Sequence, residues 1–436
     1  MSEQQPNLRL NSWKEIAEYL GREVRTAARW EKDFGLPVHR IGGGKGHSVF
    51  AYTTEIDEWL SRTRPNGDST QPLTTGVSSE AEPPRSRRQW RWWIFGAASV
   101  LSVAVFAWRT FLVRPEILMA RVSNGTLTAY NADKRALWTV VFDDAGIGRP
   151  PAVVDLNAKG SKEIVAFKNG LPVTYGAPAQ NAELAAFSAN GRELWRFTPR
   201  MSLKFGDQTY KGPWSGHTWT TIQSPTGPIF TMAVHDYVWW PAVVISVDAF
   251  GKTLGQFVSS GWVTTLAYLD RGAKPMLLAG GISNSRDSAM LAVLNPDHPF
   301  GSSPEDPGSI YECLSCPEGK PLEYFIFPRS ELNRASGSRY NEVIAIEPFA
   351  DRILVRVREV DPAVFPTFSV IEAIYEFTTD LKVRGFRFSD HYWDAHRHLE
   401  REGKLNHSFA NDRTHLVIVR NWQPQSGWRE ISVPLL

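Results

Sequence analysis

Residues 127–138, LTAYNADKRALW, and residues 184–195, LAAFSANGRELW, can be laid over each other at an offset of 57 residues. A third copy, VDAFGKTLGQF at residues 247–257, follows the second by 60 residues. Each copy predicts a strand, a polar turn and a second strand that ends on aromatic residues. Such a unit has a hydrophobic face that only a neighbouring unit can cover, so the copies indicate a repeat architecture.

Further strand–turn–strand patterns lie between the copies, at residues 152–166 and 266–279. Four strands per period is typical of a propeller blade. Residues 152–166 resemble the FG-GAP or VCBS blades of integrin-like propellers, and the copies that end in Trp138 and Trp195 resemble quinoprotein-type blades. The repeats span about residues 120–300, while residues 343–357 and 374–388 are strand-like without a clear register. We therefore expect residues 114–436 to form a large all-β domain, a β-propeller of five to seven blades.

The composition is compatible with this expectation. The chain has 436 residues, 33 glycines, 29 prolines and 12% aromatic residues, which favours short strands and many turns. Its length predicts more than one folded unit. The net charge of +2 is close to neutral, so any nucleic-acid-binding surface must be local.

An uncharged apolar stretch, WWIFGAASVLSVAVFAW, occupies residues 92–108. As a helix it would cover roughly 26 Å, and about 33 Å if continued to Val113, which brackets the thickness of a bilayer core. Arginines at 85, 87, 88 and 91 outnumber those beyond the stretch. The sequence thus predicts a transmembrane helix at residues 90–113, in a single-pass protein of the inner membrane with a cytoplasmic N-terminus and a periplasmic or extracellular C-terminal domain. A buried core helix or a cleaved signal peptide explains this stretch less well.

Residues 65–89 are rich in Pro, Gly, Ser and Thr and have no apolar periodicity, so we expect a disordered linker. Before it, residues 1–64 predict a small, mainly α-helical domain. Ser12 and Glu15 fit a capping box at the start of a helix that runs to Leu20. After a turn at Gly21, a second helix carries Val24, Ala27 and Trp30 on an apolar stripe.

The rest of the domain predicts a hairpin and a third helix. Residues 38–41 pair with residues 48–52 across a glycine-rich loop with a cationic tip. Thr54 caps the last helix, which directs Ile56, Trp59 and Leu60 inward. This order of elements over residues 10–62 resembles the winged helix-turn-helix of the MerR and excisionase type, although Glu23 stands where that family has a Ser or Thr cap.

The resemblance implies that the N-terminal domain binds double-stranded DNA. Arg25, Thr26 and Arg29 would then face the major groove. The residues near phosphates would be Lys32, Arg40, Lys45 and His47. Two alternatives are that these charges only solvate a helix, and that the domain docks a protein.

Residues with metal-binding or redox chemistry are few. Asp155, Asn157 and Glu163 follow the calcium pattern of an FG-GAP turn, but Lys159 occupies a ligand position, so we expect a structural turn without metal. The only cysteines, Cys313 and Cys316, are expected to form a local disulfide. The stretch HYWDAHRH places three histidines at 391, 396 and 398, either a ligand cluster or solvated surface. Four tryptophans could form either a sugar-stacking platform or a blade core: Trp214, Trp219, Trp239 and Trp240.

We find no nucleophile elbow, phosphate loop or carboxylate pair, so the sequence predicts no catalytic residue, no cofactor and no enzyme activity. The organisation resembles that of membrane one-component regulators of the ToxR or CadC kind, and so implies transcriptional control by a signal, ligand or protein partner sensed through residues 114–436. A homodimer is compatible with this function. The alternatives are an adhesion propeller whose N-terminal domain docks a protein, and an exported propeller enzyme.

Overall fold

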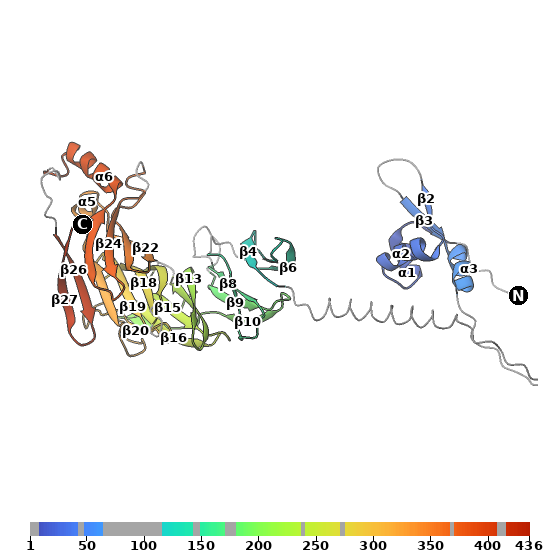
Figure 1. Cartoon of the computed structure of the whole chain (residues 1–436), viewed down its shortest axis with the longest axis horizontal. Coiled ribbons are helices and arrows are strands. Elements are labelled where there is room, and N and C mark those ends of the chain that lie inside the picture. The colour runs from blue at the N-terminus through green and yellow to red at the C-terminus, as the bar shows by residue number, and fades with distance from the viewer. Residues whose placement is uncertain are drawn as a thin grey trace, which may run out of the picture. The chain divides into compact units, whose positions relative to one another are not determined.

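The protein divides into two compact units, Met1–Trp90 and Arg91–Leu436, which we call the N-terminal unit and the β domain. The computed structural model in Figure 1 describes residues 8–41, 48–63, 116–142, 149–170, 180–236, 240–270, 275–366, 370–407 and 416–436. The predicted linker at residues 65–89 and the predicted span at residues 90–113 lie outside these ranges. Each unit is described by itself.

The N-terminal unit combines three helices with a small antiparallel sheet of strand order β1-β3-β2. Its elements are β1 (Arg9–Leu10), α1 (Trp13–Tyr19), α2 (Val24–Phe34), β2 (His39–Ile41), β3 (Ser48–Tyr52) and α3 (Thr53–Thr63). Ser12 caps α1 by accepting from the Glu15 amide at 3.2 Å, as the capping box predicts. The predicted hairpin is also present, with His39 opposite Phe50.

A small hydrophobic core holds these elements together. Ile16, Ala27 and Ile56 are fully buried, one from each helix. Two predicted core positions are wrong, because Val24 is 44% exposed and Leu60 is 36% exposed. Both lie near a helix end or on a helix edge, where spacing along the sequence does not determine what covers the side chain.

Five sheets and one separate hairpin make up the described part of the β domain. The first sheet contains β4 (Met119–Ser123), β5 (Thr126–Tyr130) and β6 (Ala136–Val141), and the second contains β7 (Ala152–Val154), β8 (Glu163–Lys168), β9 (Glu183–Phe187) and β10 (Glu193–Phe197). The separate hairpin is β11 (Leu203–Phe205) with β12 (Gln208–Tyr210). The first two sheets are wholly antiparallel, so the chain passes through each by successive hairpins.

The third and fourth sheets have five and six strands, and the fifth has four. The third contains β13 (Ser215–Ser224), β14 (Gly227–His235), β15 (Ala242–Val247), β16 (Thr253–Ser259) and the parallel edge strand β20 (Phe300–Ser302). The fourth contains β17 (Val263–Leu269), β18 (Met276–Ser283), β19 (Ser288–Leu294), β21 (Glu323–Phe327), β26 (Leu416–Gln423) and β27 (Gly427–Pro434). The fifth contains β22 (Glu342–Pro348), β23 (Arg352–Arg358), β24 (Glu372–Thr378) and β25 (Val383–Phe388). Two helices complete the domain, α5 (Glu331–Ala335) and α6 (Asp390–Arg401).

The sequence repeat corresponds to one recurrent five-residue turn. It joins β5 to β6, β9 to β10 and β15 to β16, and a fourth copy that the sequence did not reveal joins β24 to β25. In every copy the first side chain accepts a hydrogen bond from the fifth amide, at 2.9 to 3.1 Å. The fourth residue always has a positive φ. The four turns are residues 131–135, 188–192, 248–252 and 378–382.

Tryptophans connect one repeat to the next. Trp138 donates its indole N–H to the carbonyl of Ala189 at 2.8 Å, and Trp195 donates in the same way to Ala249 at 2.9 Å. Each indole also packs on the turn glycine of that next repeat: a Cβ at Gly191 would lie 2.8 Å from Trp138, and one at Gly251 would lie 2.7 Å from Trp195. The repeats are therefore coupled directly, as the exposed faces of single units predict.

Successive sheets share a hydrophobic cluster, so the second, third and fourth sheets each pack against two neighbours. Strand β8 illustrates this: Ile164 and Ala166 pack toward the first sheet, while Val165 and Phe167 pack toward the third. Alternate side chains of a strand face opposite sides, so a strand that is buried on both sides reads as a continuous apolar run. Within the described residues no such cluster joins the fifth sheet to the first.

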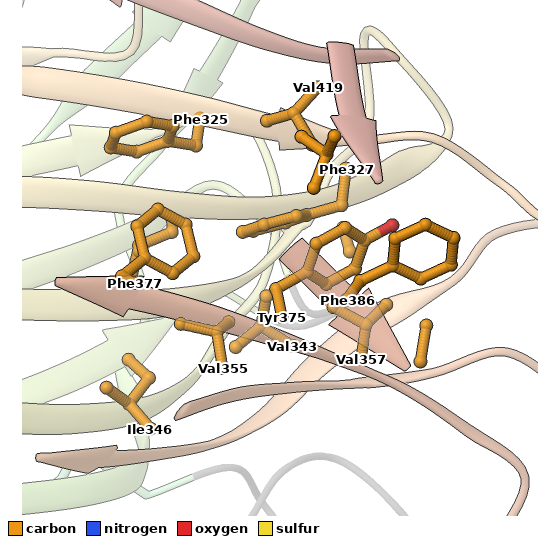
Figure 2. Packing of buried hydrophobic residues seen from close by; sticks show 14 of the residues in the cluster. Phe325, Phe327, Val343, Ile346, Val355, Val357, Tyr375, Phe377, Phe386 and Val419 are labelled. Carbon is orange, nitrogen blue, oxygen red and sulfur yellow. The ribbon is translucent and has the colours of Figure 1, made fainter. Parts of the chain in front are cut away.

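The largest cluster lies between the fourth and fifth sheets (Figure 2). Phe327 from β21 packs on Tyr375 from β24 with ring centroids 4.6 Å apart, and Tyr375 packs on Phe386 from β25 at 5.5 Å. The C-terminus strengthens the same junction, because the Leu436 amide donates to the Phe386 carbonyl at 2.8 Å. Aromatic contacts of this kind stabilise a core beyond the area that they bury.

The predicted membrane localisation is corrected here. Among the described residues, no helix is both long and apolar enough to span a membrane, which contradicts the prediction of a single-pass inner-membrane protein. The longest described helix, α6, has 12 residues. At 1.5 Å per residue it extends about 18 Å, well short of a hydrocarbon core of about 30 Å.

Candidate functional site

The exposed face of α2 carries a row of cations. Arg25, Arg29 and Lys32 are spaced at i, i+4 and i+7, so they lie on one side of the helix, and all three are exposed. None of them makes an ion pair with any described residue. Thr26, the fourth predicted contact residue on this helix, is half-buried. The structure therefore brings the three predicted cations together and leaves their charges available.

The opposite side of α2 holds the helix in place. Ala27 is fully buried, and Trp30 packs on Trp59 of α3 with ring centroids 5.8 Å apart. The Trp59 indole N–H donates to the carbonyl of Phe34 at 2.8 Å, which satisfies one of the free carbonyls at the end of α2. Gly35 ends the helix in the left-handed conformation, with φ of 65°. The basic face is thus fixed by contacts that do not use its own charged side chains.

The hairpin after α2 adds a second basic element with a different arrangement. Arg40 donates to both carboxylate oxygens of Glu31 at 2.8 Å, so its charge compensates the acidic residue on α2 rather than standing free. Lys45 and His47 lie outside the described residues. Sequence reasoning missed Arg9, whose guanidinium lies 4.0 Å from the centroid of the Phe50 ring and so is held beside the hairpin. Arg9 lies in β1, before the first helix, so no helical periodicity in the sequence related it to the cations of α2.

An aromatic pocket of about 340 Å³ lies in the β domain. Trp240, Trp262 and Tyr311 line it together with Asn284, Asp287 and Arg339. Of the predicted tryptophan platform, only Trp240 is here. Trp214 and Trp219 are 1% and 2% exposed and belong to the core, and Trp239 lies outside the described residues.

A histidine pair adjoins this pocket. His217 meets Trp262 edge-on with ring centroids 4.7 Å apart, and His235 lies 6.3 Å from the same ring. The pKa of His217 is lowered to about 4, mainly by desolvation and to a lesser extent by repulsion from His235, although part of the residue is exposed. Both imidazoles are therefore neutral at physiological pH, since desolvation also lowers the pKa of His235.

The predicted disulfide packs against the hydrophobic core, and the calcium-like turn is held by its own backbone hydrogen bonds. Cys313 and Cys316 form a disulfide that packs against the cluster between the second and third sheets. Asp155 accepts hydrogen bonds from the amides of Asn157, Lys159 and Gly160. Its carboxylate oxygens accept from the backbone of its own turn, and these hydrogen bonds close the loop.

Comparisons with known proteins give fold-level likeness only. No protein-family profile matches the chain, and no curated protein matches it. Among solved structures, similarity extends to a protein of unknown function from Bacteroides caccae, with 12% identity over 63% of this chain and 92% of the other and a TM-score of 0.24. The Dos1 propeller shares 8% identity over 71% of this chain and 64% of its own, with a TM-score of 0.31. The β domain is thus a large all-β structure with propeller-like neighbours.

The prediction that the chain is not an enzyme is corrected by the same comparison. Similar structures include the rhamnogalacturonan lyase YesW, with 12% identity over 74% of this chain and 68% of the lyase and a TM-score of 0.29. Catalytic groups on a β scaffold come from separate strands and need no short motif, so the lack of a motif was a poor reason to exclude catalysis. Likeness at this TM-score assigns no activity to this chain.

Proposed function

We propose that the protein regulates transcription by binding double-stranded DNA through its N-terminal unit. The row formed by Arg25, Arg29 and Lys32 carries the proposal, because three exposed cations on one helix face have no ion-pair partner among the described residues. A helix of this width fits the major groove, and arginine is the side chain that most often forks onto guanine. In this proposal α1 and α2 form a helix-turn-helix, and β2 and β3 form its wing.

The arrangement of charges on α2 favours a DNA-binding role over that of a helix whose charges only face solvent. Glu31 would repel phosphates, but its carboxylate is paired with Arg40 at 2.8 Å. Thr26 lies between the two arginines in sequence and is half-buried. In this proposal its hydroxyl contacts a base edge or a phosphate. We assign base contacts to Arg25, Thr26 and Arg29, and phosphate contacts to Lys32 and the hairpin.

For the β domain we propose a β-propeller-like arrangement with five blades that receives a ligand or a protein partner. The repeated turns and the clusters shared between successive sheets support the blades. The aromatic pocket at Trp240, Trp262 and Tyr311 is our candidate for the ligand. Aromatic walls with a few polar groups are typical of small-molecule sites.

Selection of duplexes from a random DNA library with the full-length protein tests the regulatory function. We expect enrichment of one sequence motif, with an affinity for the selected duplex that falls steeply as salt rises. Arg62→Ala, on α3, provides a control that removes an exposed arginine from another helix. Recovery of no motif, together with equal affinity for all duplexes, would refute the proposal.

A further inference from the structure

A cluster of two histidines and one glutamate joins α5 to the segment after α6. Glu331 is the first residue of α5, His396 lies in the middle of α6, and His407 follows that helix. One oxygen, Glu331 Oε1, lies 2.9 Å from His396 Nε2 and 3.0 Å from His407 Nε2. The potential ligand atoms of the three residues all lie within 4.8 Å of one another.

The other nitrogen of His396 also faces a carboxylate. Glu400, one turn further along α6, places Oε1 2.6 Å from His396 Nδ1. The His396 side chain is only 1% exposed, so both contacts are shielded from water. A neutral imidazole has one N–H, which can serve only one of the two carboxylates. In the neutral ring the second nitrogen then presents a lone pair to an oxygen lone pair, unless a proton or a metal ion lies between them.

We propose that Glu331, His396 and His407 bind a divalent transition-metal ion of the zinc type, with Glu400 as a positioning residue. Two imidazoles and one carboxylate are a donor set that zinc accepts, with a fourth position open. Ligand atoms about 2.0–2.1 Å from a tetrahedral ion lie roughly 3.3 Å apart. The two pairs that include Glu331, at 2.9 and 3.0 Å, must separate by a few tenths of an ångström, and the two histidine nitrogens, which lie within 4.8 Å of each other, must adjust to the same spacing. In this proposal Glu400, whose Oε1 lies 2.6 Å from Nδ1, orients the ring so that Nε2 faces the metal, as carboxylates behind metal-bound histidines do.

The charge balance also favours a cation. Two carboxylates flank His396, Glu331 at 2.9 Å and Glu400 at 2.6 Å, and a divalent ion would neutralise their two formal negative charges. A pocket of about 320 Å³ has Glu331, Arg334 and Tyr375 among its lining residues, so the glutamate of the cluster borders a cavity. The remaining histidines of α6 do not join the cluster, because His391 pairs with Asp394 and His398 with Glu402.

Zinc binding to the full-length protein tests this site. The protein is first stripped with a chelator, and zinc chloride is then titrated against a competing chromophoric chelator. We expect one tight equivalent per chain, and at least a tenfold loss of affinity in Glu331→Gln and in His407→Ala. Glu400→Gln should weaken binding about 10–100-fold while keeping one equivalent.

His398→Ala is the matched control, because it removes a half-exposed histidine from the same helix without touching the cluster. It should bind zinc as the unaltered protein does. Cobalt substitution gives a second measurement, since visible absorption reports a tetrahedral nitrogen and oxygen environment and should disappear in His407→Ala. His407 is 49% exposed, so this variant should melt at the same temperature as the stripped parent. Absence of a tight equivalent, or its persistence in both Glu331→Gln and His407→Ala, would overturn the proposal.

Discussion

Replacement of Gly191 by alanine tests the coupling between successive repeats. Gly191 has φ of 79°, which an alanine adopts at a cost of about 1–2 kcal/mol. Its new Cβ would lie 2.8 Å from the Trp138 ring, so the indole must move. That movement breaks the 2.8 Å hydrogen bond to Ala189, worth about 0.5–1.5 kcal/mol. We therefore expect Gly191→Ala to lower the free energy of unfolding by about 1.5–3.5 kcal/mol.

A second glycine separates backbone strain from the effect on the indole. Gly308 has φ of 76°, but nothing lies within 4 Å of the position where its Cβ would stand. Gly308→Ala should cost only the backbone term, about 1–2 kcal/mol. In a Trp138→Ala background, Gly191→Ala should fall to that same value, because the ring is gone. Urea unfolding of the full-length protein, followed by circular dichroism, measures all four variants. Equal losses at the two glycines, or an unchanged cost without Trp138, would refute the coupling.

Three further predictions concern other parts of the chain. Ile56→Ala should destabilise the N-terminal unit by about 2–5 kcal/mol, whereas Val24→Ala, at a side chain that is 44% exposed, should stay within about 0.5 kcal/mol in the same thermal melts. The folded-state pKa of His217 is lowered to about 4, so the contribution of this residue to stability is present above pH 6.5 and is lost as pH falls toward 4. In urea unfolding, the midpoint of the parent should therefore fall more over this pH range than that of a His217→Gln variant. Equal falls in the two proteins would contradict the prediction. Deletion of residues 127–183 removes a whole repeat and should abolish cooperative unfolding of the β domain, so an unchanged melting temperature would argue for independent modules.

The fourth repeat shows why part of the fold could not be predicted. The sequence repeat was recognisable in the three copies that have an alanine at the second turn position and that align with one another on both sides of the turn. The turn itself requires only a side-chain oxygen at its first residue and a positive φ at its fourth. Thr378 and Leu381 meet these conditions, with φ of 64° at Leu381, although a leucine there gives no turn signal. Hydrogen-bond geometry was conserved where residue type was not.

The metal-ligating cluster shows the same limit for sites. Three histidines at 391, 396 and 398 are close in sequence, but successive helical residues are about 100° apart, so His396 and His398 face nearly opposite sides of α6. The true neighbour of His396 is Glu331, which is 65 residues away in the chain. In contrast, the basic row on α2 was predictable, because its members share one helix and follow its periodicity.

The most direct test of DNA recognition compares Arg29→Ala with Arg62→Ala on the selected duplex. Both arginines lie on helices of the N-terminal unit, but only Arg29 lies on the basic face of α2. If Arg29 forks onto a guanine, Arg29→Ala should cost about 1–3 kcal/mol in binding, or roughly 5–150-fold, and relax the preference at one base pair. Arg62→Ala should keep both the affinity and the preference. Circular dichroism checks that both variants are folded. An Arg29→Ala protein with unchanged affinity and unchanged base preference would contradict the assignment of α2 as the recognition helix.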